Sequence, residues 1–307
     1  MAAADQAPAI RILCLGEALV DLICERPVRT LAEADSFVPR FGGAVANVAV
    51  SASRAGAQVA LAGGAGDDPW GHWLRDRLEA ECVDHSLFEL LPGTATPLAF
   101  VTIDERGEPS YDIHGEMIAT IVHALRDRLE EAIASSAALF FSSNTLVGAD
   151  ERAVTMRARE IALQLERPVI FDPNLRLRRW SSRADAAASA NASVPGALLV
   201  RCNLSEAQLM TGEDDPERAA AALLGAGSKL VAITLGPAGA ILRGALSADV
   251  PGVPVKVRST VGAGDVLTGT VLARLSQSAF DPRSMTAALH AGVAASAVAC
   301  ERWGALD

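Results

Sequence analysis

The sequence has few aromatic residues and almost no lysine. Aromatic residues make up 4% of the 307 positions, and Tyr111 is the only tyrosine. Few rings argue against recognition of bases by stacking. Lys229 and Lys256 are the only lysines, so arginine carries nearly all the positive charge, and the formal net charge is −10. This balance argues against broad binding to nucleic acid or acidic membranes, although a small anionic ligand needs only a local positive site.

Cysteine pairs and long apolar runs are also missing. The cysteines are odd in number, lie far apart and form no C-x-x-C pair, and most lie in apolar runs, as expected for buried residues in a reducing cytoplasm. Neither they nor the histidines show a spacing typical of zinc ligands. No apolar run is long enough to span a membrane, and residues 1–9 lack the basic and apolar regions of a signal peptide. We therefore expect a cytoplasmic location and no membrane partner.

Apolar segments of strand length alternate with segments of helical periodicity over most of the chain. This alternation predicts an α/β fold, with a mostly parallel sheet that has helices on both faces. The predicted strands are 10–15, 58–62, 137–142, 168–171, 197–202 and 230–235, and the predicted helices include 44–54, 70–80, 121–135, 150–165, 183–193, 205–211, 216–226 and 265–275. Two β-rich excursions, at about 18–40 and 92–115, interrupt the alternation. We expect one domain over 1–307 in which these excursions form a small lid.

A glycine-rich turn near the C-terminus combines two features that conflict. A β-like run at 253–257 leads to Gly262-Ala263-Gly264, whose uncovered amides at a helix start form a seat for an anion. Asp265 follows at once and would repel a bound phosphate. The conflict disappears if this carboxylate accepts a proton from an acceptor hydroxyl while the amides hold a phosphoryl group. Taken alone, an ordinary turn with an Asp that complements the helix dipole is the more frequent explanation.

Other polar junctions follow predicted strands, where ligands bind in parallel α/β sheets. These junctions are Asp172-Pro173-Asn174-Leu175-Arg176, Asn203-Leu204-Ser205-Glu206 and Thr234-Leu235-Gly236-Pro237-Ala238-Gly239. The second could simply cap a helix, and the third could be a hairpin turn. A Walker A loop is absent because neither lysine lies in one, and Pro69 stands where a dinucleotide fingerprint needs its third glycine.

The motifs resemble the ribokinase-like (PfkB) carbohydrate kinases, and among these they are most similar to fructokinases. The resemblance covers nearly the whole chain. Its most specific parts are Gly42-Gly43-Ala44-Val45-Ala46-Asn47 and Thr260-Val261-Gly262-Ala263-Gly264-Asp265, in this order and far apart. The segment Phe171-Asp172-Pro173-Asn174-Leu175-Arg176, with Trp180, favours a fructokinase. The resemblance implies a ribokinase-like fold with a β-rich lid and transfer of the γ-phosphoryl group of ATP to a sugar hydroxyl.

The resemblance also implies roles for individual residues. Asp265 is expected to be the catalytic base, and the turn of Gly262, Ala263 and Gly264 the anion hole. The expected sugar-binding residues are Asp21, Gly42, Gly43, Asn47 and Arg176. The expected nucleotide-binding residues are Asn203, Glu206, Thr234, Gly236 and Gly239, of which Asn203 and Glu206 would act on Mg²⁺ indirectly. Sugar and ATP are the expected small-molecule partners, and a homodimer through the lid is typical of the family.

The sequence departs from the family in three places. Ser259 stands where the family usually has an aspartate associated with a monovalent-cation site, which leaves K⁺ activation open. Near Val293 the family's usual Asn or His towards adenine is missing, so the adenine pocket is unassigned. The chain ends at Asp307, where relatives usually continue, so we expect either that the C-terminal strand of the family is missing or that this sequence is cut short.

Three alternatives to a fructokinase are open at this stage. A 2-keto-3-deoxygluconate kinase would need a site for the substrate carboxylate, and Arg176 could serve that acid as well as a neutral sugar. A nucleoside kinase is disfavoured by the shortage of aromatic residues. A catalytically silent, sugar-binding relative is disfavoured by the intact Gly-Ala-Gly-Asp turn, and Ser259 is the main feature in its favour.

Overall fold

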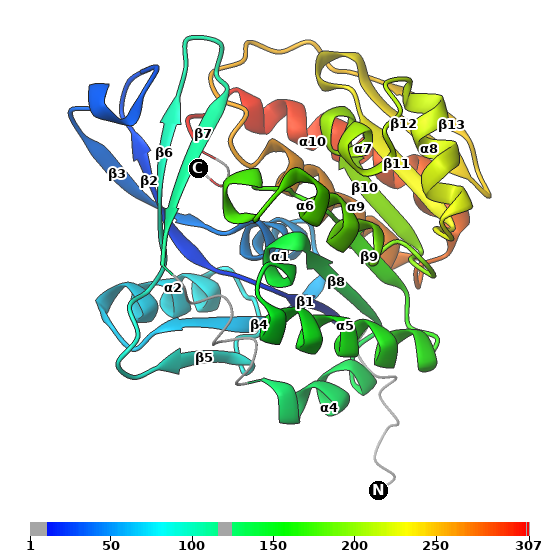
Figure 1. Cartoon of the computed structure of the whole chain (residues 1–307), viewed down its shortest axis with the longest axis horizontal. Coiled ribbons are helices and arrows are strands. Elements are labelled where there is room, and N and C mark those ends of the chain that lie inside the picture. Colours follow the sequence, from blue (N-terminus) through cyan, green and yellow to red (C-terminus); the bar gives the residue numbers. More distant parts are fainter. Residues whose placement is uncertain (1–10, 116–124, 305, 307) are drawn as a thin grey trace, which may run out of the picture.

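The computed structural model describes residues 11–115, 125–304 and 306, and contains a large sheet between two layers of helices and a second, smaller sheet (Figure 1). The large sheet is 9-stranded, in the order β13-β12-β11-β10-β9-β8-β1-β4-β5. Its strands are β1 (Arg11–Leu15), β4 (Gln58–Gly66), β5 (Phe88–Leu91), β8 (Ala138–Ser142), β9 (Val169–Asp172), β10 (Leu199–Asn203), β11 (Leu230–Thr234), β12 (Gly239–Gly244) and β13 (Ala248–Pro251). From β5 to β11 neighbouring strands are parallel, and β12 and β13 are each antiparallel to the strand before.

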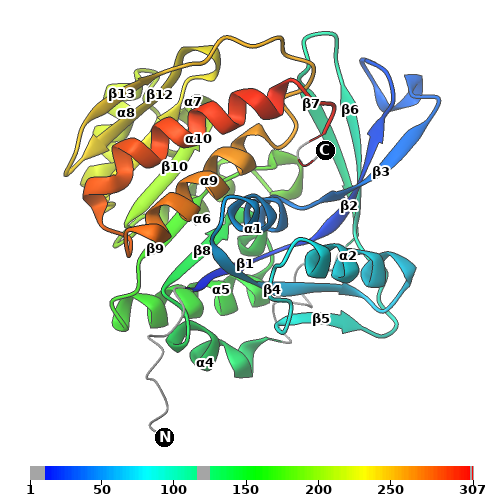
Figure 2. The same cartoon turned by 180° about the vertical axis from the view of Figure 1, so that it is seen from behind.

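Helices cover both faces of this sheet, because its central strands are apolar on both sides. Residues 12–15 of β1 are all fully buried, for example. The helices are α1 (Ala44–Arg54), α2 (Pro69–Ala80), α4 (Leu129–Ala134), α5 (Ala149–Gln164), α6 (Arg183–Asn191), α7 (Leu204–Thr211), α8 (Pro216–Gly225), α9 (Ala263–Gln277) and α10 (Met285–Cys300). Helices α1, α2, α9 and α10 cover one face (Figure 2), and α4 to α8 cover the other (Figure 1). The predicted α/β fold is confirmed.

Helices α1 and α9 pack unusually closely. A Cβ atom on Gly269 of α9 would lie 2.5 Å from the Cβ atom of Ser51 and 2.7 Å from the carbonyl oxygen of Val48, both on α1. Only glycine fits there, which explains the run of small residues in the sequence of α1. One turn before this contact, α1 carries Asn47 and α9 carries Asp265. The close packing therefore brings two of the predicted site residues together.

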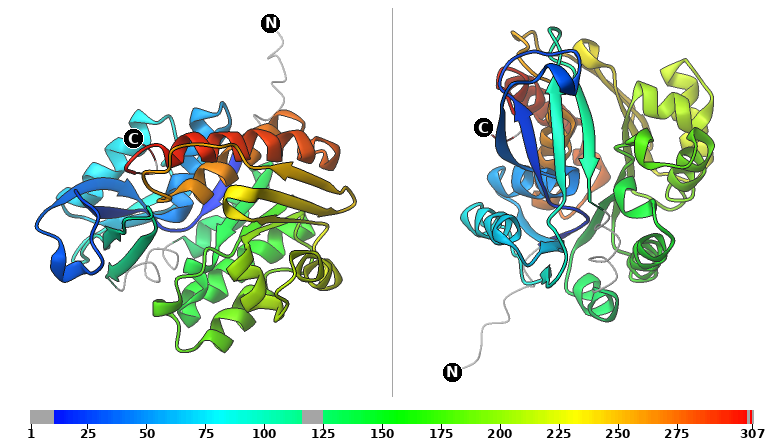
Figure 3. Two further views of the ribbon diagram at one scale, coloured as in Figure 1. Left: turned by 90° about the horizontal axis from the view of Figure 1, so that it is seen from above. Right: turned by 60° about the vertical axis from the view of Figure 1, so that its left-hand side comes forward.

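The second sheet is 4-stranded and lies beside the carboxyl ends of the main strands (Figures 1 and 3). Its order is β3-β2-β6-β7, formed by β2 (Leu19–Cys24), β3 (Phe37–Gly42), β6 (Leu98–Ile103) and β7 (Pro109–His114). Strand β2 follows β1 after a short turn, so the small sheet is connected directly to a carboxyl end of the large one. Strands β6 and β7 form the hairpin that the sequence predicts.

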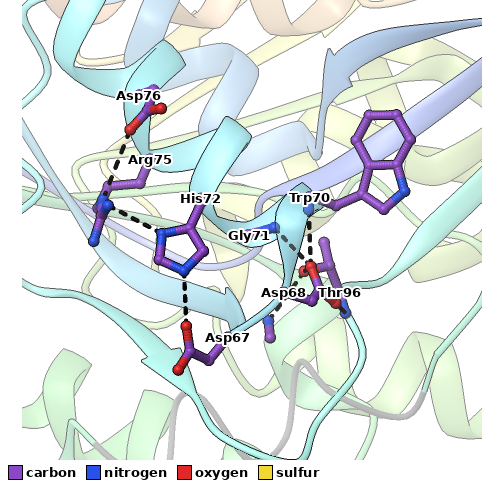
Figure 4. Close-up of polar contacts among 9 residues, drawn as sticks. Asp67, Asp68, Trp70, Gly71, His72, Arg75, Asp76 and Thr96 are labelled. Atoms are coloured by element: carbon purple, nitrogen blue, oxygen red, sulfur yellow. Dashed lines mark hydrogen bonds and ion pairs between the residues drawn. The ribbon is translucent and has the colours of Figure 1, made fainter.

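A single aspartate anchors the beginning of β6 to the large sheet (Figure 4). The carboxylate of Asp68 accepts hydrogen bonds from the amides of Trp70 and Gly71, both at 2.9 Å, and so caps α2. It also accepts hydrogen bonds from the backbone N and the Oγ1 of Thr96, each at 2.7 Å. Because Thr96 lies just before β6, these hydrogen bonds fix the position at which the chain enters the small sheet.

Several predicted elements differ from the structure. Residues 253–257 form no strand, because Pro254 has no N–H to donate and the segment pairs with no described strand. Residues 121–124 of the predicted helix 121–135 lie outside the described residues, and its described part contains a 3-10 turn (Arg126–Arg128) followed by α4. Strands β5 and β13 were not predicted. Among the described residues, no helix is long and apolar enough to cross a membrane.

Candidate active site

The glycine-rich turn forms the beginning of α9, as the sequence predicts. Gly262 caps the helix with a left-handed backbone (φ 67°), a conformation that favours glycine. The helix starts at Ala263, and the first-turn carboxylate of Asp265 is only 6% exposed. The turn therefore leaves the amides of Gly262 and Gly264 without a backbone partner among the described residues, beside a buried carboxylate, whereas the Ala263 amide donates to the Thr260 carbonyl oxygen at 3.2 Å.

Two asparagine amides hold the Asp265 carboxylate. Asn47 Nδ2 donates to one oxygen at 2.9 Å, and Asn174 Nδ2 donates to the other at 3.2 Å. Burial raises the pKa of Asp265 to about 7, although the Asn47 hydrogen bond and nearby Arg176 lower it. A carboxylate with this pKa can accept a proton near neutral pH.

A second buried carboxylate, Asp21 of β2, is 5% exposed and electrostatically coupled to the first. Burial and then the charge of Asp265 raise its pKa to about 8, although Arg176 lowers it. Gly42 lies directly against it, because a Cβ atom there would be 2.4 Å from the Asp21 Cγ. Gly43 has a φ of 95°, and a Cβ atom there would lie 2.6 Å from the Glu17 carbonyl oxygen. Both glycines are thus needed where the chain enters α1.

Glu17 holds the first turn of α1 in place. Its Oε1 accepts hydrogen bonds from the Ala44 amide at 3.0 Å and from Asn144 Nδ2 at 2.8 Å. The side chain is 3% exposed, so this carboxylate is buried at the positive end of a helix. Its effect on the site is indirect, since Asn47 lies in the turn that Glu17 fixes.

Arg176 connects the two sheets. It follows β9, and its guanidinium carbon lies 4.6 Å from the centroid of the Tyr111 ring on β7. This distance is typical of a cation–π contact. The small sheet therefore contacts the candidate site through an aromatic ring, and Arg176 makes no ion pair with any described carboxylate.

Asn203 and Glu206 form a reciprocal cap at the start of α7. The Glu206 amide donates to Asn203 Oδ1 and the Asn203 amide donates to Glu206 Oε2, both at 2.9 Å. The other oxygen, Glu206 Oε1, accepts from the Leu175 amide at 2.8 Å. The expectation of a cap is thus confirmed, and the carboxylate also fixes the segment after β9.

The Asn203 and Glu206 pair fits a magnesium ion only in an indirect way. Both carboxylate oxygens of Glu206 already accept backbone hydrogen bonds, and the described residues contain no group of three or more side chains that could enclose a metal ion. Mg²⁺ usually keeps several waters and binds through few carboxylates plus phosphates. These residues suit contact with its water shell.

Thr234, Gly236 and Gly239 lie at the turn between β11 and β12. The two strands are antiparallel neighbours, so this junction is the hairpin turn that the sequence offered as one alternative. Gly239 has a φ of 100°, and a Cβ atom there would lie 2.0 Å from the Val250 carbonyl oxygen. Thr234 ends β11 opposite Asn203, which ends β10, so two predicted residues lie next to each other at the carboxyl ends of neighbouring strands.

A cavity of about 1190 Å³ brings most of these residues together. The predicted residues that line it are Arg176, Asn203, Glu206, Thr234, Gly236, Gly239, Gly262, Ala263, Gly264 and Asp265. Asp21, Gly42, Gly43 and Asn47 are not among the lining residues and lie buried behind Asp265. The volume exceeds what one small ligand needs and suits two neighbouring ligands.

Sequence reasoning did not assign a role to Asn174, Arg201, Tyr111 or Glu17. Arg201 gave a signal, because it is a charged residue within the otherwise apolar and buried run of β10. Asn174 gave a weaker one, since it lies in a junction after a strand. The contact of Tyr111 depends on how the two sheets meet, which no local pattern shows.

Comparison with known proteins places the chain in a family. The model of the pfkB family of carbohydrate kinases matches residues 9–307. Fructokinase-1 of Oryza sativa subsp. japonica is 32% identical over 280 residues, which are 89% of this chain and 84% of that protein.

Solved structures agree with this placement and with the predicted ribokinase-like fold. A double mutant of a fructokinase from Vibrio cholerae O395, in its fructose-, ADP- and potassium-bound form, has a TM-score of 0.84 and 27% identity over 98% of this chain and 96% of that one. A fructokinase with bound ATP from Xylella fastidiosa has a TM-score of 0.82 and 26% identity over 96% and 93%. The chain belongs to the pfkB family of carbohydrate kinases and is a sugar phosphotransferase.

Proposed function

We propose that this enzyme is a fructokinase, which transfers the γ-phosphoryl group of ATP to a hydroxyl group of fructose. The observation that carries the proposal is the position of Asp265, a buried carboxylate with a pKa of about 7 in the first turn of α9. Fructokinases among the relatives, and the fructose, ADP and ATP bound in the two solved structures named above, support this choice of substrates.

In the proposed mechanism, the chain positions the reactants and balances charge. Asp265 accepts the proton of the attacking hydroxyl, while the amides from Gly262 to Gly264 hold the phosphoryl oxygens. Arg176 binds sugar hydroxyls from the cavity wall. Asp21, Asn47 and the backbone at Gly42 and Gly43, which lie buried behind Asp265, bind the sugar hydroxyls that reach past this carboxylate. Thr234, Gly236 and Gly239 contact the nucleotide from the edge of β11.

Magnesium is part of the proposal, and Asn203 and Glu206 would hold its hydrating waters. When bound, Mg²⁺ would neutralise charge on the phosphates. Burial, followed by the charge of Asp172, raises the pKa of Glu206, whereas the backbone hydrogen bond from Asn203 lowers it. A nearby cation would favour its ionised form.

An acidic sugar such as 2-keto-3-deoxygluconate is the second candidate substrate. The observation in its favour is Arg176, a guanidinium in the cavity wall that pairs with no described carboxylate. If the substrate is the acid, Arg176→Ala should abolish binding of the acid. If the substrate is fructose, the same change should weaken fructose binding only partly.

A homodimer through the small sheet belongs to the same proposal. Phe37, Phe100 and His114 form a row of edge-to-face rings across this sheet, with centroids 5.3 and 5.5 Å apart. In the single chain the rings of Phe37 and Phe100 are half-buried and His114 is exposed. Light scattering of the wild type and of Phe100→Ser would test this: a dimer that dissociates in the variant supports the interface.

The substrate is tested by ADP release with ATP and Mg²⁺ over fructose, ribose, 2-keto-3-deoxygluconate, glucose and adenosine. We expect the highest kcat/KM with fructose. A higher value with the acid would make the second candidate the substrate, and no turnover with any of them would contradict both. The same panel with and without K⁺ tests whether the enzyme is activated by this cation. Ser259 Oγ accepts a hydrogen bond from the Val261 amide at 3.1 Å, and an equal rate in both conditions would show that a chain with serine at this position is not activated by K⁺.

A further inference from the structure

Arg201 is a charged residue within the core of the protein. It is the third residue of β10, and the residues before and after it are apolar and fully buried. Its own exposure is 8%, yet it lines the cavity that contains Gly264 and Asp265. An ion pair replaced by apolar side chains of similar size usually leaves a protein as stable or more stable. Stability alone therefore does not explain a guanidinium at this place.

The guanidinium is held rigidly on one side. Its Nη1 donates to Asp172 Oδ2 at 3.0 Å, and its Nη2 donates to Thr234 Oγ1 at 3.2 Å. Asp172 Oδ2 also accepts from Thr268 Oγ1 at 2.9 Å, on α9 one turn after Asp265. This network fixes Arg201 relative to the helix that carries the proposed base.

Arg201 keeps its charge and has donor capacity to spare. Burial works against the charge, but the carboxylates of Asp172 and Glu206 outweigh it and raise the pKa above its usual value. Its Nε is buried and has no hydrogen-bond partner among the described residues. A buried donor without a partner is costly, and such groups in native proteins usually have a functional explanation.

The guanidinium lies directly against the glycine-rich turn. A Cβ atom on Gly264 would be 2.9 Å from Nη1 and 3.1 Å from Nη2 of Arg201. The two lysines of the chain do not line the cavity. Arg106, Arg176, Arg178 and Arg179 line it as well, but the three atoms nearest to a Cβ atom on Gly264 all belong to Arg201. Arg201 is therefore the arginine best placed to add positive charge to the backbone amides of this turn.

We propose that Arg201 contacts the phosphoryl group during its transfer, so that the anion site consists of the backbone turn and one buried guanidinium. This assignment rests on the proposed kinase function. In the step, a bond forms between the sugar oxygen and the γ-phosphorus while the bond from that phosphorus to the ADP oxygen breaks. The hydroxyl proton goes to Asp265, and the negative charge that moves onto the ADP oxygen lies within reach of Arg201. Asp172 and Thr234 are positioning residues for the guanidinium.

The test compares a double variant with a conservative one. Arg201→Gln combined with Asp172→Asn removes the charge without leaving a buried carboxylate unpaired. Arg201→Lys keeps the charge but loses the planar geometry. The matched control is Arg11→Gln combined with Asp84→Asn, which removes a partly buried ion pair of 2.7 Å outside the cavity. Steady-state kinetics are measured with the best substrate of the wild type.

We expect kcat of the double variant to fall by roughly 10²–10³-fold, the usual effect of losing one charge-stabilising donor. Arg201→Lys should recover part of this loss, and the control should keep its kcat. Calorimetry adds a binding measurement: affinity for ADP with aluminium fluoride and sugar should fall at least about tenfold more than affinity for ADP alone.

Two results would overturn the assignment. One is a double variant whose kcat stays within about threefold of the wild type. The other is an equal loss of affinity for ADP and for ADP with aluminium fluoride, which would show a purely structural role. Failure of the wild type itself to phosphorylate any sugar would instead contradict the proposed function, and the Arg201 assignment with it.

Discussion

Asn47 and Asp265, which are 218 residues apart in the sequence, are joined by a buried hydrogen bond of 2.9 Å. The bond exists because α1 and α9 approach so closely that Gly269 has no room for a side chain. The same amide that fixes the carboxylate also lowers its pKa, against the stronger effect of burial. This one helix contact therefore acts on both the position and the proton affinity of the proposed base.

The activity should depend on the ionisation of Asp265. Since burial raises its pKa to about 7, kcat/KM should fall as the pH drops through about 7, because the protonated acid cannot accept a proton. Because the Asn47 amide lowers this pKa, Asn47→Leu should move the acid limb to higher pH. A pH–rate profile of both proteins checks this, and an acid limb below about pH 5 in the wild type would contradict it.

Folding stability should show the same ionisation with a defined sign. A carboxyl group whose pKa is raised on folding stabilises the protein fully below its unfolded pKa, and this contribution is lost as the pH rises through about 7. Asp265→Asn never ionises, so its free energy of unfolding should exceed that of the wild type by about 1–3 kcal/mol at pH 8. The difference should shrink towards pH 4. Urea unfolding at both pH values measures it, and a difference that grows towards low pH would refute the assignment.

A methyl group on Gly264 should displace Arg201. The Cβ atom would lie 2.9 Å from Nη1, and the guanidinium is held by Asp172 and Thr234. We expect Gly264→Ala to lower kcat by about 10–100-fold with little change in sugar affinity. Gly225→Ala is the control, because that helical glycine has open space around it. Equal kcat values for the two variants would count against this contact.

The contact between Arg176 and Tyr111 should contribute to sugar binding. Tyr111→Ala removes the ring that positions the guanidinium, and its loss should raise the KM for sugar by about 2- to 30-fold, the range for ~0.5–2 kcal/mol. Tyr111→Phe keeps the ring and should stay within about twofold of the wild type. An equal rise in KM in both variants would show that the phenol hydroxyl and not the ring is the important group, and an unchanged KM in Tyr111→Ala would contradict the contact.

Much of the fold follows from the sequence because it depends on local periodicity. A buried parallel strand and a helix that covers a sheet each have a characteristic pattern of apolar residues, which can be recognised in the sequence of that segment alone. The run at 253–257 was wrongly predicted as a strand because its valines favour a strand, whereas pairing needs a neighbour and donors that Pro254 does not supply. Strands β5 and β13 are short edge strands, and only their tertiary neighbours define them.

The site was predictable where motif residues lie at strand ends, and less so elsewhere. Asp265 and the glycine turn are visible in the sequence because a carboxylate beside an anion seat is unusual. The clamp on Asp265 by Asn174 and the position of Arg201 against Gly264 depend on which strands are neighbours. Burial of Asp21 and Asn47 behind Asp265 likewise results from how α1 packs, which sequence alone does not show.

The most direct measurement is the turnover rate of Asp265→Asn beside its binding of ATP and sugar. The amide keeps the shape of the side chain but cannot accept the hydroxyl proton. We predict a kcat that is lower by roughly 10²–10⁴-fold, the contribution of a positioned base, with affinities for ATP and sugar nearly unchanged. Asp76→Asn, on the exposed face of α2, should keep the wild-type rate. Near-normal turnover of Asp265→Asn would contradict the central claim that Asp265 is the base.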